Sequence, residues 1–226
     1  MCFQFNVRFL VFFIFSTFLL SCSSTHQAYL RTISLALDES KDINLETSDI
    51  SESPVDFIYV KKGSFSTIVL ALAFIENGQY KWISSDKAAL IEKNGRIIKT
   101  LALEHNLDFL TAQNDDPLAK IIEVHNPPSW YRTIDFDNKH FGVQVSSNFE
   151  LKGTHILTIQ ERNIETVLIE ERVNILENNI HQFSPNEWTN EFWLDRNSGQ
   201  VIRSKQKVLP NGEYFDITYV SRALRL

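Results

Sequence analysis

Residues 65–85 read FSTIVLALAFIENGQYKWISS, and this stretch contains the pattern that decides the fold. Two runs rich in β-branched and aromatic residues flank the dipeptide Asn77-Gly78. Asn and Gly tolerate the two positive φ angles of a type I′ turn, whose twist matches that of two antiparallel strands. The stretch therefore predicts a β-hairpin.

The same turn signal returns along the chain. Asn94-Gly95 separates AALIEK from RIIKTLAL. In the C-terminal third, Asn197-Ser198-Gly199 and Asn211-Gly212 separate the runs FWLDR, QVIRSKQKVL and EYFDITYV, which predicts a three-stranded meander. Further strands are predicted over residues 141–145, 154–160 and 165–173.

Helical signals are short. Apolar residues recur at helical spacing between Thr25 and Asp38, which predicts a short amphipathic helix. One helical turn is expected over 45–50 and a brief helix over 103–110. With about ten strands joined by short turns, the chain is predicted to be mainly β, with antiparallel meander sheets that form a sandwich or a partly closed barrel.

The first residues have the pattern of a secretion leader. Arg8 and the amino terminus supply positive charge, and Phe9 to Leu20 form an uncharged apolar run. Such a run is shorter than the roughly 20 residues that a membrane-spanning helix needs. We therefore expect a leader that is removed rather than a permanent anchor.

The leader ends at Leu19-Leu20-Ser21-Cys22, which resembles a bacterial lipobox. In that motif the cysteine becomes the acylated first residue, and several acyl chains suffice for stable anchoring. Ser23 and Ser24 lack the aspartate that retains such proteins at the inner membrane, so the outer membrane is expected, with the body facing the periplasm. The alternative is an ordinary secretory peptide that contains a cysteine. The expected division is a leader at 1–21, a lipid-anchored helix and connector at 22–54, and a β domain at 55–226.

Composition excludes some partners. The formal net charge is −6, whereas nucleic-acid binders concentrate Lys and Arg on one surface. No nucleic-acid partner is therefore expected. The two cysteines are Cys2, in the leader, and Cys22, so no disulfide is expected in the mature chain.

Motifs for catalysis and for metal or cofactor binding are absent from the sequence. There is no GxSxG, HExxH, CxxC or glycine-rich phosphate loop, and the histidines are scattered. Asp135-Phe136-Asp137 has the DxD form of some glycosyltransferases, but a turn is the favoured interpretation. A glycan hydrolase would need two facing carboxyls, for which the candidates are Glu165, Glu170, Glu171 and Asp195. We expect no enzyme, no metal site and no cofactor.

Aromatic residues offer a different kind of site. Sugar rings pack their C–H faces on indole and phenol rings while polar groups bond the hydroxyls. The candidates for contact with a glycan or a partner are Trp130, Tyr131, Trp82 and Trp188. The competing interpretation is that large aromatics on strands belong to the core, which is the expected place of Trp193.

Several stretches resemble a known family. They are DINLETSDISESPVDFIYVKKG, FIENGQYKWISSDKAALIEKNGRIIKTLAL, ETVLIEE and NEFWLDRNSGQVIRSKQ, and together they extend over most of the chain. They resemble the YjbF or GfcB family, the group 4 capsule polysaccharide lipoproteins. The resemblance implies an outer-membrane lipoprotein that accompanies capsule or exopolysaccharide secretion, and it supplies no catalytic residues.

Two functions of different classes follow. The first is a non-catalytic module that assists secretion or assembly of capsule polysaccharide or exopolysaccharide by contacting the polymer or export proteins. The alternative is a carrier that holds a lipid or acyl chain in a cavity of a curved sheet. A glycan hydrolase ranks last.

Overall fold

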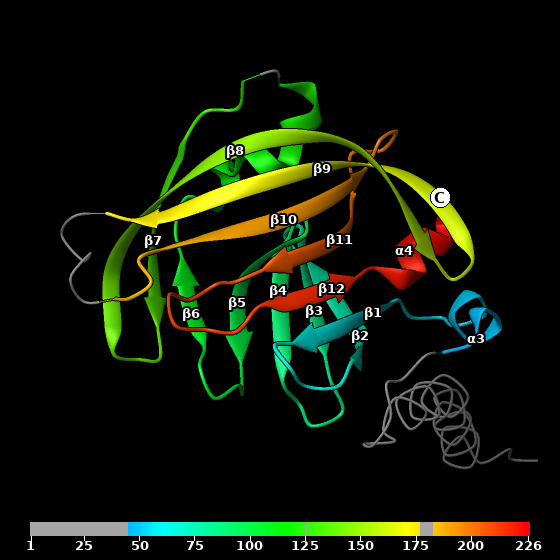
Figure 1. The fold of residues 1–226 in the computed structure, drawn as a ribbon. Helices are drawn as coiled ribbons and strands as arrows, with labels where there is room; N and C mark the ends of the chain where they lie inside the picture. Colours follow the sequence, from blue (N-terminus) through cyan, green and yellow to red (C-terminus); the bar gives the residue numbers. More distant parts are fainter. Residues whose placement is uncertain (1–44, 125, 177–182) are drawn as a thin grey trace, which may run out of the picture.

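The computed structural model describes residues 45–124, 126–176 and 183–226. In these residues twelve strands form one antiparallel sheet with the order β5-β4-β3-β2-β1-β12-β11-β10-β9-β8-β7-β6 (Figure 1). The strands are β1 Phe57–Lys62, β2 Ile68–Glu76, β3 Gln79–Ile83, β4 Ala89–Lys93, β5 Arg96–Leu101, β6 Leu107–Leu110, β7 Trp130–Phe136, β8 His140–Ile159, β9 Arg162–Ile175, β10 Glu187–Asp195, β11 Val201–Gln206 and β12 Phe215–Thr218. The helices are α3 Thr47–Ser51, η1 Gln113–Asp115, η2 Pro117–Glu123 and α4 Val220–Arg225.

The predicted hairpins are confirmed. β2 pairs with β3 around Asn77-Gly78, and β4 pairs with β5 around Asn94-Gly95. Both residues of each dipeptide have positive φ, as a type I′ turn requires. The C-terminal meander is also present, because β11 pairs with both β10 and β12.

The helical and strand predictions differ from the structure in two places. Residues 103–110, expected as a brief helix, contain β6, in which Leu107 pairs with Phe136 of β7. The strands predicted at 141–145 and 154–160 are one strand, β8. A register shift at Gly153, whose φ is +110°, lets β8 bend and continue along β9. The turn expected over 45–50 is confirmed as α3, and the helix expected over 25–38 lies outside the described residues.

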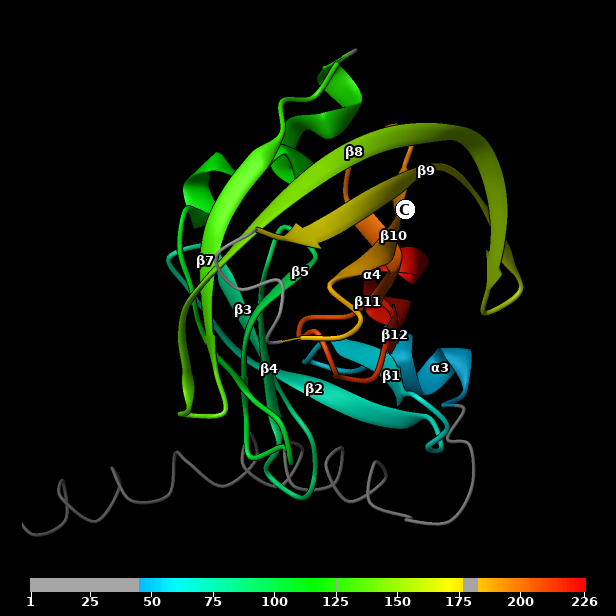
Figure 2. The same cartoon turned by 60° about the vertical axis from the view of Figure 1, so that its left-hand side comes forward.

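The sheet curls until its two outer strands, β5 and β6, lie beside each other. Side chains, instead of a strand ladder, join them. The Leu107 amide donates to Thr100 Oγ1 at 2.9 Å, and Thr100 Oγ1 donates to Asn106 Oδ1 at 3.3 Å. The mainly β prediction is therefore confirmed, in the form of a nearly closed barrel (Figure 2).

Alternate residues of the strands fill the barrel. One interior cluster joins Ile58, Phe192 and Ile217 to Leu118 and Ile121 of η2, and a second interior cluster lies under β6 to β9. A third cluster lies on the outer surface of the sheet. It forms where α3, α4 and the tip of the β8–β9 hairpin cover the outer faces of β1, β2 and β11.

None of the described helices is both long and apolar enough to cross a membrane.

Candidate functional site

Three of the four predicted aromatic contact residues are buried. Trp130, Trp82 and Trp188 are 2%, 3% and 7% exposed. The indole nitrogens of Trp130 and Trp188 donate inward, to the carbonyl oxygens of Ala112 and Lys207. The expectation that these three rings form a surface platform is therefore corrected to the competing interpretation, the core. Tyr131, on the outward-facing side of β7, is 63% exposed.

Trp130 lies within a buried ionic cluster. The guanidinium carbons of Arg96 and Arg132 lie 4.7 Å and 4.0 Å from its ring centroid. Arg96 also bonds Asp116 and donates to Glu171 at 2.7 Å. These groups come from β5, β7, β9 and the N-cap of η2, so the cluster crosses the interior of the barrel. We call Arg96, Asp116, Arg132 and Glu171 the interior ionic cluster.

The pKa values of this cluster show how its charges depend on one another. Burial alone would raise the pKa of Glu171, but Arg96 and Arg132 outweigh it and lower the pKa to about 2. Burial lowers the pKa of Arg132 to about 10. Burial would likewise lower the pKa of Arg96, but Asp116 and Glu171 outweigh it and raise that pKa. Glu171, Arg96 and Arg132 are therefore charged at neutral pH.

The cluster leaves little space in the part of the interior that it lines. A cavity bounded by Arg96, Arg132, Asn190 and neighbouring residues has a volume of about 20 Å³. A space of that size holds about one water molecule. An acyl chain does not fit there, and charged groups make poor walls for it. This geometry argues against an acyl chain in this part of the interior.

The carboxylates considered for a hydrolase have structural partners. Glu171 belongs to the interior ionic cluster, and Glu165 pairs with Arg196 at the surface. The Asp195 carboxylate accepts from the Ser198 amide within the β10–β11 turn. Glu170 lies 3.4 Å from Lys152 on the outer surface.

The acidic motif of β7 also serves a turn. The Asp135 carboxylate accepts from the Gly142 amide, and Asp137, with φ at +56°, accepts from the Asn106 amide. This agrees with the predicted turn role. No cluster of three or more candidate metal ligands occurs within the described ranges 45–124, 126–176 and 183–226.

The outer face of the sheet carries a row of partly exposed residues. Strand registers place Trp193 opposite Arg203, Arg203 opposite Thr218, and Thr218 opposite Tyr59. The Arg203 guanidinium lies 5.2 Å from the Trp193 ring centroid, and it donates twice to Asp216, at 3.0 Å and 2.7 Å. We call Trp193, Arg203, Thr218 and Tyr59 the outer row.

The place of Trp193 corrects the expectation that it lies in the core. Its neighbours Phe192 and Leu194 are both buried in the barrel interior. Since successive side chains of a strand point to opposite faces, Trp193 must face outward, where it is partly exposed. The alternation of residue types within FWLD was the sequence signal for this residue. The signal separates the two faces of the strand, but it does not say which face lies in the barrel interior.

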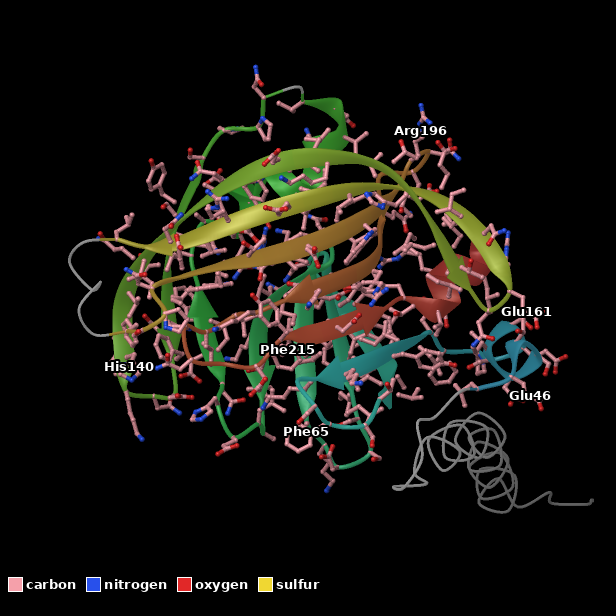
Figure 3. All side chains as sticks on the ribbon, in the orientation of Figure 1. Glu46, Phe65, His140, Glu161, Arg196 and Phe215 are labelled. Atoms are coloured by element: carbon pink, nitrogen blue, oxygen red, sulfur yellow. The ribbon has the colours of Figure 1, made fainter. Side chains whose placement is uncertain are left out.

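The outer row leads into a crevice of about 470 Å³. Its floor includes Tyr59, Arg203 and Thr218, and the hairpin segment 157–161 and Thr47 of α3 line its other sides. Figure 3 labels Glu161 of the hairpin and Glu46 beside α3, at the same end of the molecule.

Hydrogen bonds hold the crevice together. Gln160 Nε2 donates to Tyr59 Oη at 3.2 Å and to the Leu45 carbonyl oxygen at 3.2 Å. Thr47 Oγ1 donates to Gln160 Oε1 at 3.1 Å. The hairpin tip is therefore fixed to the floor of the crevice and to α3, so the crevice is pre-formed.

The groups that line the crevice are better suited to binding a sugar than to catalysing a reaction. Hydroxyl, amide and guanidinium groups lie beside the Trp193 and Tyr59 rings, a combination that pairs hydroxyl bonding with ring stacking. Glu161 is the one carboxylate among the described residues that line it. Glycoside hydrolysis generally uses two facing carboxyls, and this crevice supplies one.

Comparison with known proteins places the chain in a family. Residues 30–220 match the model of the group 4 capsule polysaccharide lipoprotein family, described as GfcB and YjbF. The chain belongs to this family. The expected resemblance is confirmed.

Relatives and a solved structure agree with the match. The lipoprotein GfcB of Escherichia coli K12 is 31% identical over 203 residues, with 88% of this chain and 92% of that protein covered. The lipoprotein YjbF of the same organism is 26% identical, with 87% and 89% covered. The crystal structure of the hypothetical lipoprotein YmcC from Escherichia coli K12 has a TM-score of 0.71 at 28% identity, with 85% of this chain and 94% of that chain covered. These relatives are lipoproteins, and Cys22, the expected lipidation site, lies outside the described residues.

Proposed function

We propose that this chain is an outer-membrane lipoprotein that assists the secretion or assembly of capsule polysaccharide or exopolysaccharide without catalysing a reaction. Acyl chains on Cys22 hold it at the membrane, with the β domain facing the periplasm. The polymer contacts the outer row and enters the adjoining crevice.

One observation carries the polymer contact: Trp193, Arg203, Thr218 and Tyr59 form a cross-strand row that ends in a pre-formed polar crevice. The sugar residues of a polysaccharide follow one another along one direction, and the outer row also extends in one direction across the strands. A flat ring stacked with a guanidinium also tolerates different sugars, because it recognises C–H faces rather than one hydroxyl pattern.

The family description supports a role connected with capsule polysaccharide, because it names these proteins as group 4 capsule polysaccharide lipoproteins. The partners of the candidate acids support a non-catalytic role. Three of these acids already bond other groups of the protein, namely Glu165, Glu171 and Asp195. None of the three is therefore an unpaired carboxyl that could act on a substrate.

Binding of the producer's own purified polysaccharide tests the proposal. We expect Trp193→Ala to weaken binding about tenfold, equivalent to about 1.4 kcal/mol, because the variant loses the stacking surface. Affinity electrophoresis or calorimetry gives the change, and thermal unfolding checks that the fold is retained.

Tyr131→Ala is the matched comparison, because this exposed aromatic lies outside the outer row. It should bind the polysaccharide as the unsubstituted chain does. If Tyr131→Ala loses binding and Trp193→Ala retains it, the contact lies on β7 and the proposed row is wrong. If the unsubstituted chain shows no binding, the proposed polymer contact is wrong.

A further inference from the structure

Among the described residues, one edge of strand β8 has no strand paired to it along part of its length. β7 pairs with β8 only as far as Ser147, whereas β9 pairs with it as far as Ile159. β9 stays paired with β10 as far as Thr166, opposite His155, and past this point β8 and β9 form a ribbon that arches beyond the end of β10 (Figures 1 and 2). The Ser129 hydroxyl donates to Asn148 Oδ1 at 2.7 Å, which covers the first residue of this edge.

The ribbon is held in place at its far end. Ile159 and Ile164 are buried in the outer cluster with α3 and α4, and Gln160 bonds Thr47. The edge between these fixed ends is therefore presented in one conformation. A pre-organised edge gives up less conformational freedom when another strand binds.

The edge lacks the usual protection along part of its length. Proteins guard open edges with charged residues, prolines and bulges. Here Lys152 and the bulge at Gly153 guard one end. From Thr154 to Thr158 the sequence THILT has no formal charge with histidine neutral, and no proline.

Ile156 lies in the middle of this unguarded segment. It is 71% exposed, more than any other large hydrophobic side chain in the described part of the chain. Within the ribbon its cross-strand neighbour is Glu165, which gives it no apolar partner at that position. An exposed apolar residue on an open, uncharged edge favours strand pairing.

We propose that two copies of this chain pair through residues 154–158 of β8, in antiparallel orientation about a two-fold axis at Ile156. This register places Ile156 opposite itself, Thr154 opposite Thr158 and His155 opposite Leu157 of the second copy. It brings apolar side chains and hydroxyls together and sets no like charges opposite each other. A two-fold interface requires this kind of self-complementarity.

The pairing also bears on the polymer site. Leu157 and Thr158 line the crevice and belong to the same strand segment, so the two-fold axis lies beside both crevices. If the proposed function holds, a pair offers two contacts to one polymer chain, which raises the overall affinity. The pairing itself does not depend on polymer binding.

Crosslinking of the full-length lipoprotein in its native membrane tests the pairing. Directly opposed Cβ atoms in antiparallel strands lie about 5 Å apart. Ile156→Cys should therefore give a covalent dimer with a short bis-maleimide reagent. Phe141→Cys is the matched control, because Phe141 is also on β8 and 67% exposed, but lies outside segment 154–158, in the part of β8 that runs beside β7. The unsubstituted chain reports any reaction at Cys22.

A second variant removes the interaction instead of trapping it. Ile156→Lys sets two like charges opposite each other and should convert the detergent-solubilised dimer to a monomer in light-scattering measurements, whereas Phe141→Lys should leave the dimer unchanged. A monomeric unsubstituted chain together with no specific crosslink from Ile156→Cys would overturn the proposal. A crosslink from Ile156→Cys to a different protein would also overturn it, in favour of strand pairing with another partner.

Discussion

Glu171 is a buried carboxylate whose charge is stabilised from several sides. Arg96 Nη1 and Asn190 Nδ2 both donate to Glu171 Oε2, at 2.7 Å and 2.9 Å. The Arg132 guanidinium lies 3.6 Å from the other carboxylate oxygen. Removing one partner of a buried ion pair costs more than the pair itself contributes, because the remaining charge stays buried without compensation.

We predict that Glu171→Gln lowers the free energy of unfolding by about 3 to 5 kcal/mol at neutral pH. Glu170→Gln is the control, because it changes the adjacent residue on the outer face, where the effect should stay within about 0.5 kcal/mol. Urea denaturation of both variants measures the difference. Similar losses in the two variants would contradict this account of the cluster.

The same carboxylate predicts a pH dependence. The pKa of Glu171 is about 2 in the folded chain, below its ordinary value of 4.5. A lowered pKa stabilises the folded state above the ordinary pKa, and this stability is lost as the pH falls from 4.5 towards 2. The difference in the free energy of unfolding between Glu171→Gln and the unsubstituted chain should therefore become smaller as the pH falls from 4.5 towards 2. Urea denaturation at several pH values measures it.

At the scale of the structural element, the Asn-Gly turns of the β2–β3 and β4–β5 hairpins differ in what surrounds them. Gly78 and Gly95 both have positive φ, so either substitution by Ala strains the backbone. A Cβ at Gly78 would meet open space, whereas at Gly95 it would lie 2.5 Å from Val201 Cβ. The β4–β5 turn is therefore packed against β11, while the β2–β3 turn is free of such contacts.

We predict that Gly78→Ala destabilises the chain by about 1 kcal/mol and that Gly95→Ala costs at least about 2 kcal/mol more. The shift in the urea midpoint gives both values. The Gly95 carbonyl oxygen also accepts from Gln206 Nε2 at 2.7 Å, so displacement of the turn would disturb β11 as well. Equal costs at the two glycines would show that the packing against Val201 can relax.

Elements that depend on distant neighbours were predicted less well. The hairpin turns were found because their signal is contained in two adjacent residues. β6 was missed because its strand state is imposed by pairing with β7 and by Thr100 at the barrel seam. The union of two predicted strands into β8 likewise depends on β9, which runs alongside both.

At the scale of the whole molecule, the proposed function depends on attachment to the membrane. Cys22→Ala should remove the acylation site and release the chain from the membrane fraction, because the acyl chains supply the anchoring free energy. Cell fractionation with immunoblotting measures the release, and the amount of extracellular polysaccharide should fall with it. Unchanged polysaccharide output from a released chain would count against a role at the membrane.

The sequence by itself determined the mainly antiparallel β class, the positions of the tight turns and the family, because these depend on short-range patterns of residue type. Only the tertiary structure decided which aromatic residues face solvent. Trp130, Trp82 and Trp188 became interior residues, and Trp193 became a surface residue, when the sheet curled and one face was enclosed. Period-two alternation separates two faces, but barrel closure chooses which of them is inside.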